Sequence, residues 1–350
     1  MAEKLRIGLI GLGWVGTARH LPAITANPVF DFVGVADRSD GKADTIARKH
    51  RLRASTAATL AEIEWIDEVD AVSIATAPMA HHDLVCEALE RGLHVITEKP
   101  FAMDVAQGEA MVRTAEMADR RLAVVHNFQF ARSMKRLRQD LESGKLGDIR
   151  GIRAIQLGNP SRRLPTWFEE LPLGLFYDES PHLLYLVASI AGPLKLTKAI
   201  CTESRHERRT PAQIDCWFET DGAKYPITLS CNFESSLSEW HVSVHGEKGV
   251  AIVDVFRDIY LHLPNDGSHG TREVLGTSLA ASAQHWWQHL TSGIPHLTGK
   301  LRYGNNEVFA RFAAAILGDR GALAPISADK ALQILSLQHD IIAQSERLYG

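Results

Sequence analysis

The sequence has few cysteines, and none of them are paired at metal-binding spacing. They show no CxxC pattern and lie too far apart for a zinc knuckle, which favours ordinary buried thiols in a reducing compartment. The four are Cys86, Cys201, Cys216 and Cys231. We therefore expect no metal site and a cytoplasmic location.

An excess of charge of one sign is also lacking. Lys and Arg together number 38 and Asp and Glu number 42, for a formal net charge of −4. A surface so nearly balanced gives no electrostatic reason to bind nucleic acid or an anionic membrane. We expect neither of these as a partner.

Long hydrophobic runs are absent from the sequence. The longest apolar stretch, Leu183–Leu194, contains Tyr185 and Pro193 and is too short to span a bilayer. The first residues lead directly into a strand-like segment, so no signal peptide is expected. Hydrophobic residues make up 45% and charged residues 23% of the chain, which is typical of soluble globular proteins. A length of 350 residues favours about two domains.

Short aliphatic runs alternate with stretches of helical length in the first part of the chain. Most of these runs lack polar alternation, which is typical of parallel strands buried on both faces. They are Leu5–Ile10, Phe30–Ala36, Ala71–Ala75, His94–Thr97 and Leu122–Val125. The alternation predicts an α/β Rossmann domain with a doubly wound parallel sheet over residues 1–127.

The pattern changes after residue 127. Strand-like runs follow one another with little helix between them, which predicts a largely antiparallel sheet. They are Ile149–Leu157, Leu194–Thr202, Ile214–Glu219, Ile227–Phe233, His241–His245 and Val250–Tyr260. Residues 128–350 are thus expected to form an α+β domain with a largely antiparallel sheet. Helical patterns return near the C-terminus, and these helices could pack back on the first domain.

A G-x-G-x-x-G motif follows the first strand and opens a helix. One glycine makes the tight turn, one lets the backbone approach a pyrophosphate, and one lets helix and strand pack closely. The helix N-terminus presents amide N–H groups to the phosphates. The motif predicts a dinucleotide site that includes Gly11, Gly13, Trp14, Val15 and Gly16.

Asp37 ends the second strand, about 20 residues after the last glycine, which is the spacing of an acid that binds ribose hydroxyls. A carboxylate at this point repels a 2′-phosphate and so favours NAD over NADP. Arg38 could instead accept such a phosphate, although stacking on adenine or facing solvent is its more ordinary role. NAD is the expected cofactor, and NADP is the alternative.

The segment Ala75–Pro100, ATAPMAHHDLVCEALERGLHVITEKP, resembles the Gfo/Idh/MocA family of NAD(P)-dependent oxidoreductases. The family has a Thr-Pro-rich turn, a His, a helix–strand junction and a Glu-Lys-Pro in this order. Two later segments, residues 144–147 and 173–182, resemble its "G.iG" turn and its "GG...D...H" segment. The matching residues include Thr76, Pro78, His81, Glu98, Lys99, Pro100, Asp178 and His182.

The resemblance implies a Rossmann domain followed by a largely open antiparallel sheet, whose outer face forms dimers or tetramers. It also implies that Lys99, Asp178 and His182 are the catalytic residues. The sequence departs from the family at two positions. Ser180 stands where a glycine is common. Tyr185 stands where many polyol-oxidising members have a second acid, and the missing acid argues against a simple inositol-type substrate.

The positions of these residues suit the expected chemistry. Lys99 follows a parallel strand and would project at the carboxyl edge, where doubly wound proteins bind ligands. Its bond to Pro100 could be cis. Asp178 and His182 are spaced i, i+4 and share a helix face, so the acid could orient the histidine and raise its basicity. Alone, each residue has an ordinary structural explanation, as a surface lysine, a helix cap or a core histidine.

Other polar and aromatic residues are candidates for binding. We expect His81 and Glu98 on the cofactor side, and Asn127 near both cofactor and substrate. In the irregular loop after residue 158, arginine forks could grip an anion and aromatic rings could pack on a sugar. These loop residues are Arg162, Arg163, Trp167 and Tyr177.

The main hypothesis is a dehydrogenase that transfers a hydride between nicotinamide and a secondary hydroxyl of a sugar, cyclitol or sugar acid. An alternative is redox-assisted glycoside cleavage, in which transient oxidation, elimination and re-reduction leave no net NADH. A third is an NAD-binding sensor without turnover, which the presence of Lys99 and His182 disfavours.

Overall fold

The computed structural model describes residues 4–205, 209–222 and 224–346. The chain divides into two compact units. The first runs to Asn127 and also takes in Asn305–Ser336; the second comprises Phe128–Gly304 and the residues from Leu337 onward. None of the described helices has the length and apolar character needed to cross a membrane.

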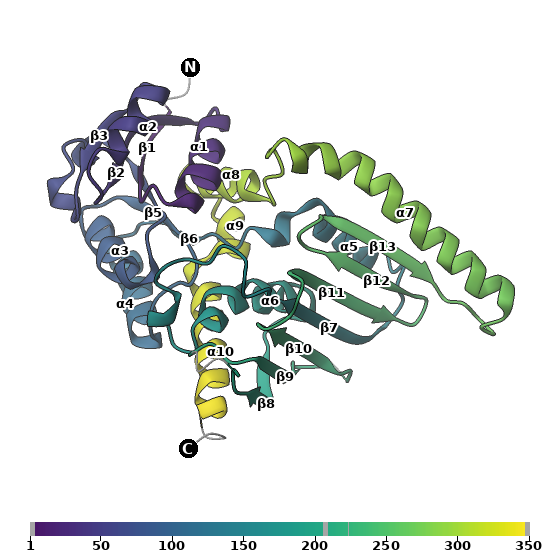
Figure 1. Ribbon diagram of the computed structural model, residues 1–350. Helices are drawn as coiled ribbons and strands as arrows, with labels where there is room; N and C mark the ends of the chain where they lie inside the picture. The colour runs from purple at the N-terminus through teal and green to yellow at the C-terminus, as the bar shows by residue number, and fades with distance from the viewer. Residues whose placement is uncertain (1–3, 206–208, 223, 347–350) are drawn as a thin grey trace. The chain divides into compact units, whose positions relative to one another are not determined.

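The first unit contains a six-stranded parallel sheet, as predicted from the sequence (Figure 1). Its strand order is β3-β2-β1-β4-β5-β6, that of a doubly wound dinucleotide-binding sheet. The strands are β1 (Leu5–Ile10), β2 (Phe30–Asp37), β3 (Arg53–Thr56), β4 (Ala71–Ile74), β5 (His94–Thr97) and β6 (Leu122–Val124). Only β3 was not expected, because this edge strand is short and partly exposed and so leaves little hydrophobic signal.

Helical segments connect these strands. The glycine motif leads into a π-helical segment, η1 (Gly16–His20), which continues as α1 (Leu21–Ala26). The others are α2 (Lys42–His50), η2 (Leu60–Glu62), η3 (Ile66–Glu68), η4 (Pro78–Ala80), α3 (His81–Glu90), α4 (Val105–Met117), α8 (Asn305–Ile316), α9 (Arg320–Leu323) and η7 (Ala324–Ile326). α8 and α9 belong to the first unit although they come late in the sequence.

One tryptophan fills the space that two strand glycines leave open. Trp65 is fully buried, and its ring lies directly against Gly8 of β1 and Gly34 of β2. A Cβ atom at Gly34 would lie 2.6 Å from ring atoms of Trp65, and one at Gly8 would lie closer still. The core on this face of the sheet therefore requires both glycines.

The second unit contains a seven-stranded, mainly antiparallel sheet of order β13-β12-β11-β7-β10-β9-β8. Among the strands described in this sheet, only β10 and β7 pair in parallel. The strands are β7 (Ile149–Leu157), β8 (Lys195–Thr202), β9 (Gln213–Glu219), β10 (Ile227–Asn232), β11 (Glu239–Gly246), β12 (Gly249–Asp254) and β13 (Ile259–Pro264). The run Val250–Tyr260 was expected to be one strand. A turn at residues 255–258, in which Asp258 has φ +52°, divides it into β12 and β13.

Helices of the second unit are η5 (Phe128–Phe130), α5 (Arg132–Glu142), η6 (Phe168–Glu170), α6 (Leu175–Ala191) and α7 (Thr271–Leu297). α10 (Ala328–Glu346) begins in the first unit and ends in the second. The sequence did not predict α7, which runs along β13 at the edge of the sheet (Figure 1). α6 carries the candidate catalytic Asp178 and His182.

We expect Gly34→Ala to destabilise the first unit by about 1–3 kcal/mol, because the added methyl group has to displace a rigid, buried indole ring. Urea denaturation measures the effect. The control is Gly276→Ala in α7, where a Cβ meets open space and alanine has the better helix propensity. Equal midpoints for the two variants would contradict the role given to Trp65.

Candidate active site

The glycine loop lies at the carboxyl ends of β1 and β4, the point where the strand order reverses. Gly11 has φ +91°, and a Cβ there would lie 2.6 Å from the carbonyl oxygen of Ala75. A Cβ at Gly16 would clash with the backbone of Gly11, whereas one at Gly13 would meet nothing within 4 Å. The outer glycines therefore permit close packing, and the middle one borders open space.

Asp37 holds this loop in place. Its carboxylate accepts hydrogen bonds from the amides of Leu12 (2.7 Å) and Ser39 (2.9 Å) and pairs with Lys42 Nζ at 3.1 Å. Burial by itself would raise the pKa of Asp37, but these hydrogen bonds outweigh it, and the pKa is lowered. An ionised carboxylate therefore stands at the end of β2, beside the exposed Arg38.

Two threonines at the same edge of the sheet have unsatisfied hydroxyls. Thr76 follows β4, and Thr97 ends β5. Both Oγ1 atoms are buried and have no hydrogen-bond partner among the described residues. Buried hydroxyls normally find a partner, so these atoms, with the space at Gly13, fit a polar ligand such as a dinucleotide.

Lys99 and Glu98 follow β5. The Lys99–Pro100 peptide bond is cis, as the sequence allows. Glu98 is buried; its Oε2 accepts from the Lys99 amide at 3.1 Å, and its Oε1 lies 2.8 Å from Nε2 of His20. Burial would raise the pKa of Glu98, but the hydrogen bond and charge of His20 and the charge of Lys99 lower it overall.

Sequence reasoning missed His20 and its partner, Ser73. His20 is fully buried, and its Nδ1 lies 2.7 Å from Ser73 Oγ. Nε2–H donates to Glu98, and Nδ1 is hydrogen-bonded to the Ser73 hydroxyl, which can either donate or accept. No sequence pattern marks this group, because His20 lies between β1 and α1, Ser73 in β4 and Glu98 after β5. Only the fold brings the three side chains together. Glu98 thus anchors the turn that carries Lys99 and is itself turned inward.

His81 has an inward position as well. It is fully buried, with Nδ1 2.8 Å from the carbonyl oxygen of Pro100 and Nε2 3.3 Å from that of Thr76. Burial lowers its pKa, although the hydrogen bonds to the two carbonyls oppose that effect. A neutral ring donates to only one of these carbonyls, and Pro100 is the nearer. Because His81 itself directly follows the turn after β4, this bond ties that turn to the turn after Lys99.

The remaining cofactor candidates also lie around the glycine loop and the ends of the strands. Trp14 is half exposed, and the guanidinium of Arg19 stacks over its ring at 5.0 Å. Val15 is partly exposed, and Pro78 and Asn127 are buried. Asn127 follows β6, the last strand at this end of the sheet.

In the second unit, His182 is held by a tyrosine. Its Nδ1 lies 3.0 Å from the hydroxyl of Tyr185, and that hydroxyl accepts a hydrogen bond from the Phe128 amide at 3.1 Å. Both side chains are buried. In the sequence, Tyr185 was notable only because it stands in place of an acid. In the structure it is the residue that fixes the His182 ring at Nδ1.

Aromatic rings surround this histidine. Phe128 lies edge-on to it with ring centroids 4.8 Å apart, and Trp240 of β11 lies at 5.2 Å. Phe128 in turn contacts Tyr303, and Trp240 contacts Phe256. The imidazole thus sits among apolar rings, and rotation about its side-chain bonds is restricted.

Two other predicted positions on α6 differ in burial. Asp178 is partly exposed near the start of the helix, one turn before His182. Tyr177 was expected in the irregular loop, but it lies within α6 and is fully buried. Its hydroxyl contacts His339 Nε2 at 3.1 Å, so its ring fills the core and presents no face to a sugar. Tyr177 points inward because the period of the helix places this position on the buried face of α6.

The loop arginine expected to grip an anion has a partner already. Arg162 pairs with Glu179, and its Nη1 donates to the carbonyl oxygen of Asn159 at 2.9 Å. Glu179 also accepts from Gln156, which is fully buried in β7. The guanidinium charge is thus balanced within the protein. Of its loop neighbours, Arg163 is exposed and Trp167 is half buried.

These features define a protein class: a dinucleotide-binding Rossmann unit with a lysine at the carboxyl edge, and a second unit with a buried histidine on an open-sheet scaffold. Residues 5–126 match the family model of the GFO_IDH_MocA oxidoreductase family, NAD-binding Rossmann fold. Residues 134–252 match the GFO/IDH/MocA C-terminal domain. The chain belongs to this family, as its motifs predicted, and is an NAD(P)-dependent oxidoreductase acting on CH–OH groups.

Similar proteins act on sugars and cyclitols. The chain is 30% identical over 229 residues to D-glucoside 3-dehydrogenase of Escherichia coli (strain K12), covering 65% of each protein. It is 23% identical over 269 residues to inositol 2-dehydrogenase of Rhizobium meliloti (strain 1021), covering 74% of this chain and 78% of that protein. The crystal structure of a putative myo-inositol dehydrogenase from Sinorhizobium meliloti 1021 has the same fold (TM-score 0.76, 20% identity, 99% and 98% covered).

The first two glycines of the loop should separate folding from binding. We expect Gly13→Ala to leave the thermal midpoint nearly unchanged and to weaken NAD binding, because its Cβ enters open space where the pyrophosphate would approach. Gly11→Ala should lower the midpoint, because of its positive φ and its contact with Ala75. Differential scanning fluorimetry and NAD titration measure both; unchanged NAD affinity in Gly13→Ala would contradict this assignment.

We expect Tyr185→Phe to lower kcat about tenfold with little change in KM, because the ring of His182 loses the hydrogen bond at Nδ1. The matched control is Tyr177→Phe, which removes a hydroxyl from the same helix and should lower stability but not kcat. Steady-state kinetics with thermal denaturation measure both variants. Equal effects on kcat would show that the hydroxyl of Tyr185 has only a structural role.

Proposed function

We propose that the protein oxidises a secondary hydroxyl of a sugar, cyclitol or sugar acid and transfers the hydride to NAD. The observation that carries the proposal is the retention of Lys99 and His182 in a chain that matches both family models. A sensor without turnover has no need of either side chain.

We assign a proton-transfer role to His182. Because Nδ1 contacts the Tyr185 hydroxyl, Nε2 is the atom that accepts the proton of the substrate hydroxyl. The surrounding Phe128 and Trp240 rings limit the orientations open to the imidazole. When bound, the nicotinamide supplies the hydride acceptor.

Lys99 and Asp178 have complementary roles in the proposal. The Lys99 ammonium stabilises the alkoxide that develops as the hydroxyl proton leaves. The sequence suggested that Asp178 orients His182; with Tyr185 at Nδ1, we assign Asp178 to hydrogen bonds with substrate hydroxyls instead. Asn127, after β6, is assigned to the substrate as well.

A neutral glycoside is the favoured substrate class. The charge of Arg162 is balanced by Glu179, so the loop offers less to a carboxylate or phosphate than its two adjacent arginines suggest. Arg163 and Trp167 are kept as contacts for the sugar. The similarity to D-glucoside 3-dehydrogenase supports glucosides as the first compounds to test.

NAD is preferred over NADP in this proposal. Asp37 is buried and has a lowered pKa, so a carboxylate stands where a 2′-phosphate would come, and the repulsion disfavours NADP. Arg38 and Lys42 lie beside it, and Lys42 is already paired with Asp37.

We also propose a cytoplasmic homodimer or homotetramer that contacts its copies through the outward face of the large sheet. All four cysteines are free thiols, in keeping with a reducing compartment.

Incubation with sugars and glycosides in heavy water, with NADH absorbance followed in parallel, tests the reaction. Net NADH with a ketone product is the expected result. Aglycone release with deuterium on carbon and no net NADH would replace the proposal with redox-assisted glycoside cleavage. NAD binding without any product across neutral and anionic sugars would contradict both.

We expect Lys99→Ala and His182→Ala each to lower kcat by about 10²–10⁴-fold, with NAD affinity within a few-fold of the parent protein. Each removes a group needed for proton transfer or alkoxide stabilisation. The matched controls are Lys195→Ala and His269→Ala, two exposed residues in ion pairs of the second unit. Full activity in either site variant would overturn the assignment.

A further inference from the structure

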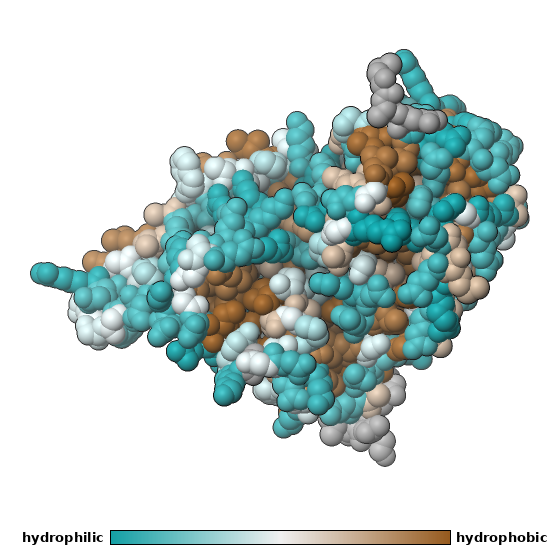
Figure 2. Space-filling model, turned by 180° about the vertical axis from the view of Figure 1, so that it is seen from behind, coloured by the Kyte–Doolittle hydropathy of each residue, from teal (hydrophilic) through white to brown (hydrophobic). Residues whose placement is uncertain are grey.

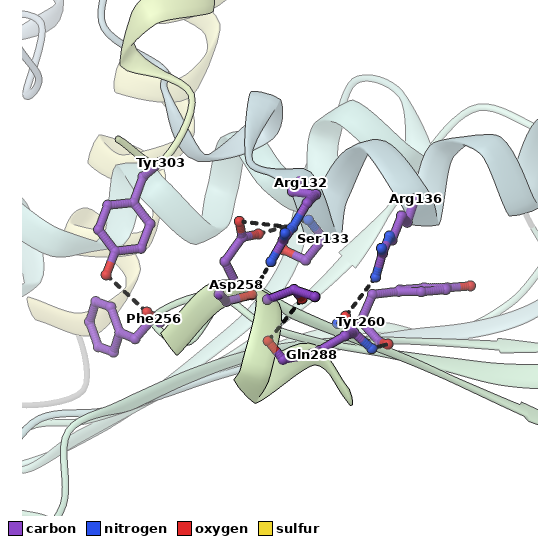
Figure 3. Close-up of polar contacts among 10 residues, drawn as sticks. Arg132, Ser133, Arg136, Phe256, Asp258, Tyr260, Gln288 and Tyr303 are labelled. Carbon is purple, nitrogen blue, oxygen red and sulfur yellow. Dashed lines mark hydrogen bonds and ion pairs between the residues drawn. The ribbon is translucent and has the colours of Figure 1, made fainter. Parts of the chain in front are cut away.

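The side of helix α7 that faces the sheet is polar. Gln284 and Gln288, one turn apart, each make two hydrogen bonds to one backbone residue of β13. Gln284 pairs with the amide and carbonyl of His262, both at 2.9 Å. Gln288 pairs with those of Tyr260, at 2.8 and 2.5 Å (Figure 3). The two glutamines thus satisfy the edge of the sheet as another strand would.

Further polar contacts hold the same face. Arg136 of α5 donates to Gln288 Oε1 at 2.9 Å, and Arg132 donates to Ser292 Oγ. Asp258, directly before β13, accepts from the Ser133 amide at 2.7 Å (Figure 3). Gln288 and Ser292 are buried, so the side of α7 that faces the protein is fixed by hydrogen bonds rather than by apolar packing.

The outer face of α7 is apolar. Of the fifteen large hydrophobic side chains exposed in the described part of the chain, eight lie on this helix. Trp286 is 71%, Trp287 65% and Leu290 63% exposed. Spacings of three, four and seven residues put most of the eight on one face. That stripe is Leu275, Leu279, Trp286, Leu290, Ile294 and Leu297. Figure 2 shows hydrophobic side chains along the margin of the second unit where α7 runs.

This face is large enough for a stable contact between proteins. With areas of roughly 150–250 Å² per residue and exposures between 59% and 87%, the six residues of the stripe present on the order of 800 Å² of apolar surface. The largest apolar patch on a monomer is typically about 300–600 Å². A standard interface buries about 800 Å² on each partner. The stripe therefore matches what one partner of a stable dimer contributes.

The distribution of side chains also suits a two-fold pairing of the helix with itself. In an antiparallel pair centred on Trp286, positions equally far from it face each other. Leu279 then meets Gly293, and Leu290 meets Ser282, so a large side chain opposes a small one in both cases. Such self-complementarity is what a two-fold interface requires.

We propose that the outer face of α7 binds the same face of a second copy of this chain, antiparallel and centred on Trp286. A membrane surface is disfavoured by charge. A helix that lies in a bilayer interface carries Lys and Arg on its polar face, whereas the polar face of α7 carries neutral side chains bonded to β13. This contact is separate from the sheet-face contact proposed above and does not depend on the reaction catalysed.

Sedimentation velocity of the full chain over a wide concentration range tests the proposal. We expect Leu290→Glu to halve the mass of the assembly, because it puts a carboxylate into the centre of the contact. The matched control is Leu317→Glu in the first unit, where the leucine is 61% exposed, and it should keep the parent mass. Leu279→Glu, three turns from Leu290, is a second variant with the same expected loss. Circular dichroism checks that the exposed substitutions leave the fold intact.

Tryptophan fluorescence gives a second measure. Acrylamide quenching should fall as the parent protein associates, since Trp286 becomes covered, and should stay high in Leu290→Glu. A parent protein that is monomeric throughout, or a mass unchanged by both α7 variants, would overturn the proposal. Co-sedimentation of the parent protein, but not of Leu290→Glu, with phosphatidylcholine–phosphatidylglycerol vesicles would also overturn it, in favour of a membrane contact.

Discussion

The backbone of Gly11 lies against the backbone of Ala75 with no room for a Cβ, and the geometry of the cofactor edge depends on this close approach. It brings the turn after β1 against the turn after β4, where the strand order reverses. The Leu12 amide then donates to Asp37, and His81 links the turn after β4 to the turn after Lys99. A single close contact thus aligns the ends of β1, β2, β4 and β5.

In both units, buried polar groups are satisfied by partners far away in the sequence. Glu98 is hydrogen-bonded to His20, and Glu179 is paired with Arg162. Gln288 forms hydrogen bonds with the backbone amide and carbonyl of Tyr260 at the edge of a sheet. Burying a charge or an amide without a partner is costly, so each of these groups restricts the arrangement of the segments that meet there. The exposed apolar face of α7 is the counterpart: glutamines on its inner side bond to β13, and its large hydrophobic side chains lie outside.

Much of the fold followed from local patterns. Aliphatic runs without polar alternation marked five of the six parallel strands, because strands buried on both faces must be apolar throughout. β3 was not predicted, because an edge strand of four residues needs little hydrophobicity. The turn that separates β12 from β13 was not predicted either. It depends on a positive φ at Asp258, and a positive φ has no strong sequence signal at residues other than glycine. α7 was missed because small and polar residues are mixed among its hydrophobic ones, and because Gly276, Gly293 and Pro295 weaken the helical signal.

For the candidate site, the sequence determined what depends on spacing along the chain: the glycine loop, the acid after β2, the lysine after β5 and the histidine one turn after Asp178. The regular geometry of strands and helices is enough to place these residues at strand ends and on helix faces. Tertiary structure decided which groups face each other. It put Tyr185 on Nδ1 of His182, Arg162 on Glu179 and the ring of Tyr177 in the core. Such pairings join residues by proximity in space, and a side chain's chemistry does not specify which of many suitable partners the fold will bring to it.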